Sequence, residues 1–182
     1  MKKFIATAAL LTTLAGCSAS AAHAATQEKV SSKPVTHVTT EFGLKSFLAK
    51  NMMLNQRQVI KKTITELKSH VGKTWYVFSG DTPRGWDCSG LVVWTYKHFG
   101  ISLQHRASKQ ALAGHVTHSP RIGDIVAFYF PGYYSAAHVG IYVGDGKMIN
   151  APRPGTVTRE ESITNGEFKD YVVRFIRVTG IL

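Results

Sequence analysis

The chain has 182 residues, of which 44% are hydrophobic and 18% charged, which is typical of a globular protein and excludes a disordered one. Its formal net charge of +11 at pH 7 favours an anionic partner. The length allows one ordinary domain after the N-terminal segment, and the sequence contains neither an internal repeat nor a second domain.

Residues 1–24 have the pattern of an export signal. Two lysines precede the apolar run Phe4–Ala15, whose length of about a dozen residues is too short to span a bilayer. Two processing sites are open. Ala22-His23-Ala24 fits a cleavage site with small residues, whereas Leu14-Ala15-Gly16-Cys17 has the form of a bacterial lipobox, which would place a lipid on Cys17.

Export sets the expected surroundings of the protein. We expect either a secreted or cell-wall protein or a membrane-anchored lipoprotein, with residues 25–40 as a flexible tether and residues 41–182 as the domain. Loss of residues 1–24 removes two of the 22 basic residues and no acid, so the charge falls from +11 to +9. Anionic cell-wall polymers suit this charge, whereas nucleic acid does not fit an exported protein, and contact with a membrane is expected only through a lipid on Cys17.

The predicted elements run from helices to strands. Glu41–His70 is expected to be helical in two pieces, followed by a short aromatic segment and a turn-rich stretch up to Gly85. A helix is predicted over Cys88–Phe99, with Asp87 as its N-cap and Gly100 at its end, and a shorter one over Ala107–Ala113. The predicted strands are Ile125–Phe130, Val139–Val143, Lys147–Asn150 and Tyr171–Val178. This order indicates an α+β fold with a mostly antiparallel sheet.

Cys88 is the first candidate for chemistry. If Cys17 is removed or acylated, Cys88 has no disulfide partner, and such a lone thiol is either buried in the core or chemically used. The N-terminal end of a helix carries about half a positive charge, which stabilises the thiolate that attacks a carbonyl group. The position of Cys88 in the first turn of its helix therefore favours a reactive thiol with a lowered pKa.

His138 is the best candidate for a partner imidazole, which would act as an ion pair with the thiol or as its base. It directly precedes a clean apolar strand and follows three small residues. The other seven histidines lie in the N-terminal segment or in polar and helix-end settings: His23, His37, His70, His98, His105, His115 and His118. His115 and His118 are three residues apart but have no further ligands beside them, so no metal site is predicted.

Asn150 becomes the third candidate through hairpin geometry. A two-residue loop between the strands would place Asn150 opposite Ile141 and turn it away from His138. A three-residue loop, Gly144-Asp145-Gly146, would place Asn150 opposite Gly140 and diagonally from His138 on the same face, within reach of a ring nitrogen. The three-residue loop is therefore a condition of a Cys-His-Asn triad; otherwise Asn150 is a residue that ends a strand.

Five strings carry a resemblance to a known family. They are Tyr76-Val77-Phe78-Ser79-Gly80, Gly85-Trp86-Asp87-Cys88-Ser89-Gly90-Leu91-Val92, Arg106-Ala107-Ser108-Lys109-Gln110, Gly123-Asp124-Ile125-Val126-Ala127-Phe128, and His138-Val139-Gly140-Ile141-Tyr142-Val143-Gly144 with Asn150-Ala151-Pro152. In this order, over about residues 56–178, they resemble the NlpC-type family of bacterial cell-wall cysteine peptidases.

The resemblance implies a papain-like fold in which the nucleophile helix packs on a small, mostly antiparallel sheet. It also implies hydrolysis of the peptide stems of peptidoglycan, commonly between D-glutamate and the diamino acid, by a monomer without a metal or organic cofactor. The roles implied by position are nucleophile for Cys88, base for His138, orienting group for Asn150, a place near the oxyanion for Tyr76, and binding of the stem's amino end for Asp87 and Ser89.

The chain departs from the family pattern at two positions. Many members have a histidine at the position of Asn150, although an asparagine also orients an imidazole. Ser79 stands where the family has the first of two glycines, and a positive φ there would cost serine on the order of 1 kcal/mol. Two other functions are compatible with the same residues. One is a different acyl transfer, by an amidase or lipid acyltransferase, and the other is non-catalytic binding to the wall.

Overall fold

A single helix of 33 residues, α1 (His37–Ser69), opens the described part of the chain. The computed structural model describes residues 37–180, with side chains from residue 41 onward, so the predicted signal, the lipobox and most of the tether lie outside the described residues. The prediction of two N-terminal helical pieces was wrong. Within α1 the sequence has no proline and one glycine, Gly43, so nothing interrupts the helical hydrogen bonds.

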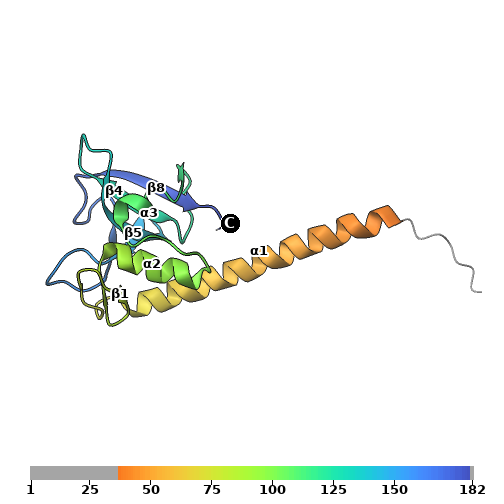
Figure 1. The fold of residues 1–182 in the computed structure, drawn as a ribbon, viewed down its shortest axis with the longest axis horizontal. Helices are drawn as coiled ribbons and strands as arrows, with labels where there is room; N and C mark the ends of the chain where they lie inside the picture. The colour runs from red at the N-terminus through yellow and green to blue at the C-terminus, as the bar shows by residue number, and fades with distance from the viewer. Residues whose placement is uncertain (1–36, 181–182) are drawn as a thin grey trace, which may run out of the picture. The chain divides into compact units, whose positions relative to one another are not determined.

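The second half of α1 joins the core, while its first half projects from the rest of the domain (Figure 1). Ile60, Ile64 and Leu67 are buried and lie on one face of the helix, whereas nearly all residues from 41 to 59 are exposed. Within residues 37–180 no helix combines the length and apolar character needed to cross a bilayer.

In the described residues up to 180, two short helices and eight strands follow α1. The strands β1 (Asp81–Thr82) and β2 (Gly85–Trp86) pair as a small hairpin, which leads directly into α2 (Cys88–His98). The remaining elements are α3 (Ala107–Gln110), β3 (Gly114–Thr117), β4 (Ile125–Tyr129), β5 (Ala136–Gly144), β6 (Lys147–Asn150), β7 (Arg159–Ser162) and β8 (Val172–Val178). All four predicted strands are present, β5 beginning three residues earlier than expected, and the helix after residue 107 is shorter than predicted.

Six strands form one sheet in the order β3-β8-β4-β5-β6-β7, and each neighbouring pair is antiparallel. The α+β prediction is thereby confirmed. The two edge strands, β3 and β7, were not predicted, because their sequences are polar and short and carry no apolar alternation.

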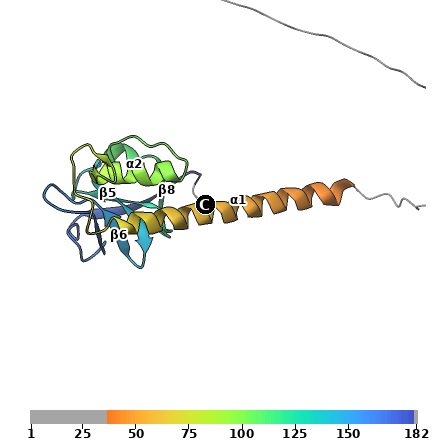
Figure 2. The ribbon, with the colours of Figure 1, turned by 90° about the horizontal axis from the view of Figure 1, so that it is seen from below.

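The sheet has an apolar cluster on each face. On one face, α2 lies beside the second half of α1 and packs against β5 (Figures 1 and 2), and this larger cluster includes Leu91, Val139 and Ile141. The smaller cluster on the other face consists of Val126, Phe128, Met148, Ile163 and Phe168. The period of two along β5 thus directs Val139 toward α2 and its neighbour His138 toward the smaller cluster.

Candidate active site

Asp87 sets where α2 begins. Its backbone is extended and its carboxylate accepts a hydrogen bond from the Gly90 N–H at 2.7 Å, so it caps the helix as predicted. Gly90 has to be a glycine here, because an added Cβ would lie 1.8 Å from the carbonyl oxygen of Gly80. The turn that follows Tyr76 is therefore pressed against the first turn of α2, which carries Cys88.

Within the described residues, the Asp87 carboxylate receives four hydrogen bonds. Besides Gly90, the donors are the Ser79 N–H at 2.9 Å, the Ser89 hydroxyl at 2.8 Å and the His105 ring at 2.9 Å. Burial alone raises the pKa of Asp87, but the bonds from His105, Gly90 and Ser89 together lower it below its ordinary value. This carboxylate is an internal anchor, and sequence reasoning missed the part played by His105, whose spacing from Asp87 gives no signal.

Ser79 adopts the left-handed backbone that the family glycine suggested, with φ at 58°. The cost of this conformation is offset by the hydrogen bond from its N–H to Asp87. Serine at this position therefore preserves the turn.

The Cys88 thiol keeps its proton at neutral pH. Burial raises the pKa of Cys88 to about 11, the neighbouring Asp87 carboxylate adds to this, and the Val139 and Ser89 N–H groups act in the opposite direction. The expected lowering by the helix terminus is thus overcome by burial. The contact with the Val139 N–H places the thiol at the start of β5, next to the residue that follows His138.

The imidazole of His138 is buried in an aromatic setting. It is 5% exposed and stacks on Phe168 with ring centroids 4.0 Å apart and planes 12° from parallel, with Phe128 nearby. Burial lowers the pKa of His138 to about 4, although the hydrogen bond to Asn150 and the charge of Asp87 act in the opposite direction. His138 is therefore a neutral ring at pH 7, and with a protonated Cys88 it fits the role of a base better than a preformed ion pair.

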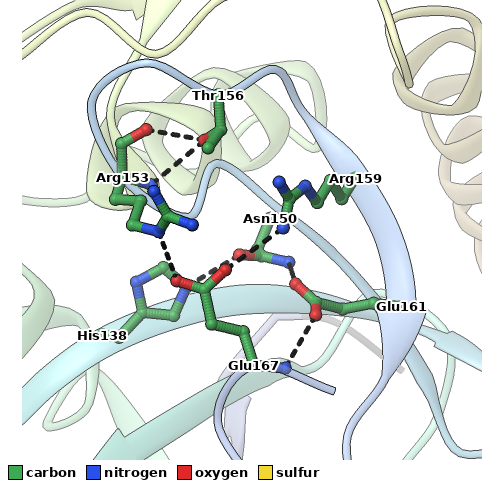
Figure 3. A network of polar contacts seen from close by, with 7 residues as sticks. All are labelled: His138, Asn150, Arg153, Thr156, Arg159, Glu161 and Glu167. Carbon is green, nitrogen blue, oxygen red and sulfur yellow. Dashed lines mark hydrogen bonds and ion pairs between the residues drawn. The ribbon is translucent and has the colours of Figure 1, made fainter.

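Asn150 lies where the triad requires it. The strand pairs Ile141–Ile149 and Tyr142–Met148 place it level with Gly140 and diagonal to His138. Its Oδ1 lies 3.0 Å from His138 Nε2 (Figure 3). Gly140 permits this approach, because an added Cβ there would lie 3.1 Å from the Cβ of Asn150.

The loop that produces this register differs from the prediction. Gly144 pairs with Lys147, so the loop has two residues, Asp145 and Gly146, both with positive φ as a type I′ turn requires. A bulge between Tyr142 and Gly144 supplies the extra residue. The three-residue loop was wrong, but the bulge shifts β6 by one residue and gives the register that the triad needs.

Asn150 has a second partner that sequence reasoning missed. Its Nδ2 donates to the Glu161 carboxylate at 2.7 Å, and Glu161 lies on β7, the strand that the sequence did not predict (Figure 3). No spacing rule links the two residues, because their contact depends on the pairing of β6 with β7.

Tyr76 is half-buried near Cys88. Burial raises the pKa of Tyr76, and negative charge on Cys88 and Asp87 would raise it further, so its hydroxyl remains a proton donor. Ser89 is buried and donates to Asp87. Roles for Tyr76, Asp87 and Ser89 in binding substrate stay predictions. Between residues 41 and 180 no three histidine, cysteine or acidic side chains are grouped as metal ligands.

Acid should destabilise the folded protein through His138. Between its ordinary pKa of 6.5 and its folded value of about 4, the unfolded chain binds a proton that the folded chain does not. Stability therefore falls as the pH is lowered through this range, by about 3 kcal/mol from this group. Urea unfolding of the wild type and of His138→Gln between pH 7 and pH 4 measures it, because the other histidines cancel in the difference. Equal losses in both proteins would contradict the prediction.

The chain is similar in sequence to known proteins. A family model described as the NlpC/P60 family matches residues 72–177. The chain is 37% identical over 100 residues to the peptidoglycan endopeptidase RipA of Mycobacterium tuberculosis, covering 54% of this chain and 21% of RipA. It is 36% identical over 113 residues to the bifunctional muramidase/DL-endopeptidase CwlT of Bacillus subtilis, covering 57% of this chain and 32% of CwlT. The chain thus spans a fifth to a third of these relatives.

A solved structure shares the fold. An NlpC/P60 family protein from Bacillus cereus superposes with a TM-score of 0.58 at 29% sequence identity, over 65% of this chain and 39% of the other.

Proposed function

The chain belongs to the NlpC/P60 family, and we propose from this that it hydrolyses the peptide stems of bacterial peptidoglycan as a cysteine endopeptidase. The observation that carries the proposal is the convergence on β5: the Cys88 thiol meets the Val139 N–H, and the neighbouring His138 is held by Asn150. Membership of the family supports peptidoglycan as the substrate, and the specific bond we propose is the one between D-glutamate and the diamino acid.

The proposed reaction starts from a neutral thiol and a neutral imidazole. His138 Nδ1 takes the Cys88 proton while the sulfur attacks the carbonyl carbon of the scissile bond, and the carbonyl electron pair moves onto the oxygen. In this proposal the Tyr76 hydroxyl, which keeps its proton, donates to this oxyanion. Return of the electron pair breaks the C–N bond, and His138 gives its proton to the leaving amine. Water, deprotonated by His138, then releases the acyl group from the sulfur and restores the thiol.

The place of action is also part of the proposal. Export, through cleavage after residue 24 or lipidation of Cys17, would bring the domain to the wall, where the net charge of +9 that remains without Lys2 and Lys3 favours contact with anionic polymers. The roles of Asp87 and Ser89 toward the amino end of the stem belong here as well, with the two side chains bonded to each other.

The test is digestion of purified peptidoglycan by the purified chain, with the released fragments identified by mass spectrometry. We expect fragments cut between D-glutamate and the diamino acid, and none from protein pretreated with iodoacetamide, which blocks the thiol. Fragments cut at another bond would overturn the specificity. A folded protein that releases nothing from several wall types would overturn the peptidase, and products carrying a transferred acyl group would indicate the alternative chemistry.

A further inference from the structure

Three polar side chains lie in a row across three neighbouring strands: His138 on β5, Asn150 on β6 and Glu161 on β7 (Figure 3). Asn150 pairs with Arg159, and Glu161 is two residues further along β7, so the alternation of side chains keeps Glu161 on the same face of the sheet. Each link is short, with 3.0 Å from His138 Nε2 to Asn150 Oδ1 and 2.7 Å from Asn150 Nδ2 to Glu161 Oε1.

We propose that Glu161 is a positioning residue. It fixes the orientation of the Asn150 amide and thereby determines which ring nitrogen of His138 carries the proton; this role rests on the peptidase mechanism proposed above. A carboxylate only accepts hydrogen bonds, so Asn150 has to turn its NH₂ group to Glu161 and its carbonyl oxygen to His138. That oxygen requires an N–H at Nε2, which leaves the lone pair on Nδ1 for the Cys88 proton.

The opposite orientation of the amide would stop the reaction. If Asn150 were flipped, its NH₂ group would face Nε2, and the proton of the neutral ring would move to Nδ1. A ring protonated at Nδ1 has no lone pair for the thiol. The family resemblance implies Asn150 as the orienting group of His138, whereas the structure assigns the choice between the two amide orientations to Glu161.

The Glu161 carboxylate is itself held at its second oxygen. Oε2 accepts the Glu167 N–H at 3.0 Å. The Glu167 side chain is fixed in turn by ion pairs with Arg153 at 2.9 Å and Arg159 at 3.1 Å (Figure 3). Both carboxylate oxygens of Glu161 therefore have a partner, which opposes rotation of the carboxylate away from Asn150.

The loop before Glu167 is shaped around this carboxylate. A Cβ added at Gly166 would lie 2.3 Å from the Ser162 carbonyl oxygen and 2.7 Å from Glu161 Oε2, so the backbone beside this carboxylate requires a glycine. Two residues after Gly166, Phe168 stacks on the His138 ring. One short segment thus contacts both the ring of His138 and the Glu161 carboxylate, which determines the ring nitrogen that carries the proton.

The decisive experiment exchanges the acceptor and the amide. In Glu161→Gln one of the two accepting oxygens is replaced by an NH₂ group. In either orientation of the new amide, this NH₂ group faces another N–H donor, either that of Asn150 or that of Glu167. In Asn150→Asp two carboxylates face each other at the 2.7 Å contact. We expect either change to slow the reaction by about 10- to 100-fold. In the double variant the amide now at position 161 donates to the carboxylate now at position 150 and accepts from the Glu167 N–H. We therefore expect a recovery of about tenfold relative to Asn150→Asp.

Two readouts keep this proposal separate from the proposed function. Turnover on peptidoglycan tests both. The rate and pH profile of iodoacetamide alkylation at Cys88, located by mass spectrometry because Cys17 is the other cysteine, test the thiol and its base without any substrate. Glu160→Gln is the matched control: its side chain lies on the opposite face and pairs with Lys68 and Lys147, so it should leave both rates unchanged.

The possible outcomes distinguish a failure of the positioning role from a failure of the proposed function. Recovery of the alkylation rate in the double variant supports the positioning role even if the wild type digests no peptidoglycan, in which case the proposed function fails alone. If the alkylation rate of the double variant is reduced by the product of the two single fold-reductions, the positioning role is overturned, whether or not the wild type is a peptidase. Slowing by Glu160→Gln equal to that by Glu161→Gln would overturn it as well.

Discussion

Replacing Cys88 by alanine should abolish the release of peptidoglycan fragments while the protein stays folded. Cys88 is the free cysteine of the described residues, and the proposed acyl intermediate forms on its sulfur. Without it the two-step route is lost, so we expect turnover to fall by at least about 10⁴-fold. The side chain is half-buried, so its loss should change the free energy of unfolding by about 1 kcal/mol. Fragment release and thermal unfolding measure the two effects.

Two further variants make this result specific. Cys88→Ser keeps nearly the same shape but offers a hydroxyl, a far weaker nucleophile next to a neutral imidazole, so it should be as inactive as the alanine variant. Cys17→Ala removes the other cysteine of the chain and should digest purified peptidoglycan as the wild type does. Activity that survives in folded Cys88→Ala but disappears in Cys17→Ala would refute the assignment of the nucleophile.

Replacing Asp87 by alanine should cause a large loss of stability for a single change that removes side-chain atoms near the site. Four donors from three parts of the chain converge on this buried carboxylate, and one of those bonds caps α2. Loss of the cap and of partners for buried donors should lower the free energy of unfolding by about 3–5 kcal/mol. Urea unfolding measures this loss.

The matched control is Asp81, an exposed aspartate on β1 of the hairpin that precedes Asp87. Asp81→Ala should change the free energy of unfolding by less than about 0.5 kcal/mol. The lowered pKa of Asp87 also predicts how this stability loss depends on pH. Its contribution is present above the ordinary pKa of an aspartate and is lost as the pH falls through the lower folded value, so the difference between wild type and Asp87→Ala should shrink in strong acid. A loss no larger than that of Asp81→Ala would mean that the four donors find other partners.

The local features of the site were predictable because they depend on neighbouring residues. The sequence Asp87-Cys88-Ser89-Gly90 contains the cap and the first turn of α2, and the capping bond spans only three residues. The alternation along β5 and β6 made the placement of Asn150 beside His138 conditional on a shift of one residue in the hairpin, which a bulge supplies instead of the predicted three-residue loop. The resemblance to the NlpC-type family pointed to the same three residues independently.

Other features depended on packing that no local pattern records. The lowered pKa expected for Cys88 rested on the helix end alone, and burial at the start of β5 reversed its direction. The hairpin reached the required register through a bulge, because a bulge and a longer loop shift β6 by the same one residue.

The sequence by itself determined the α+β class and the start of α2, because caps and alternation act over a few residues. The pairing of His138 with Asn150 depended on the hairpin register, which the bulge in β5 decided. Only the tertiary structure decided that His105 joins Asp87, 18 residues away, and that Glu161 holds Asn150. β7 is too polar to be recognised as a strand and exists through its pairing with β6. Contacts created by strand pairing and burial form only when the whole sheet is assembled. In our proposal, those contacts determine which ring nitrogen of His138 carries the proton.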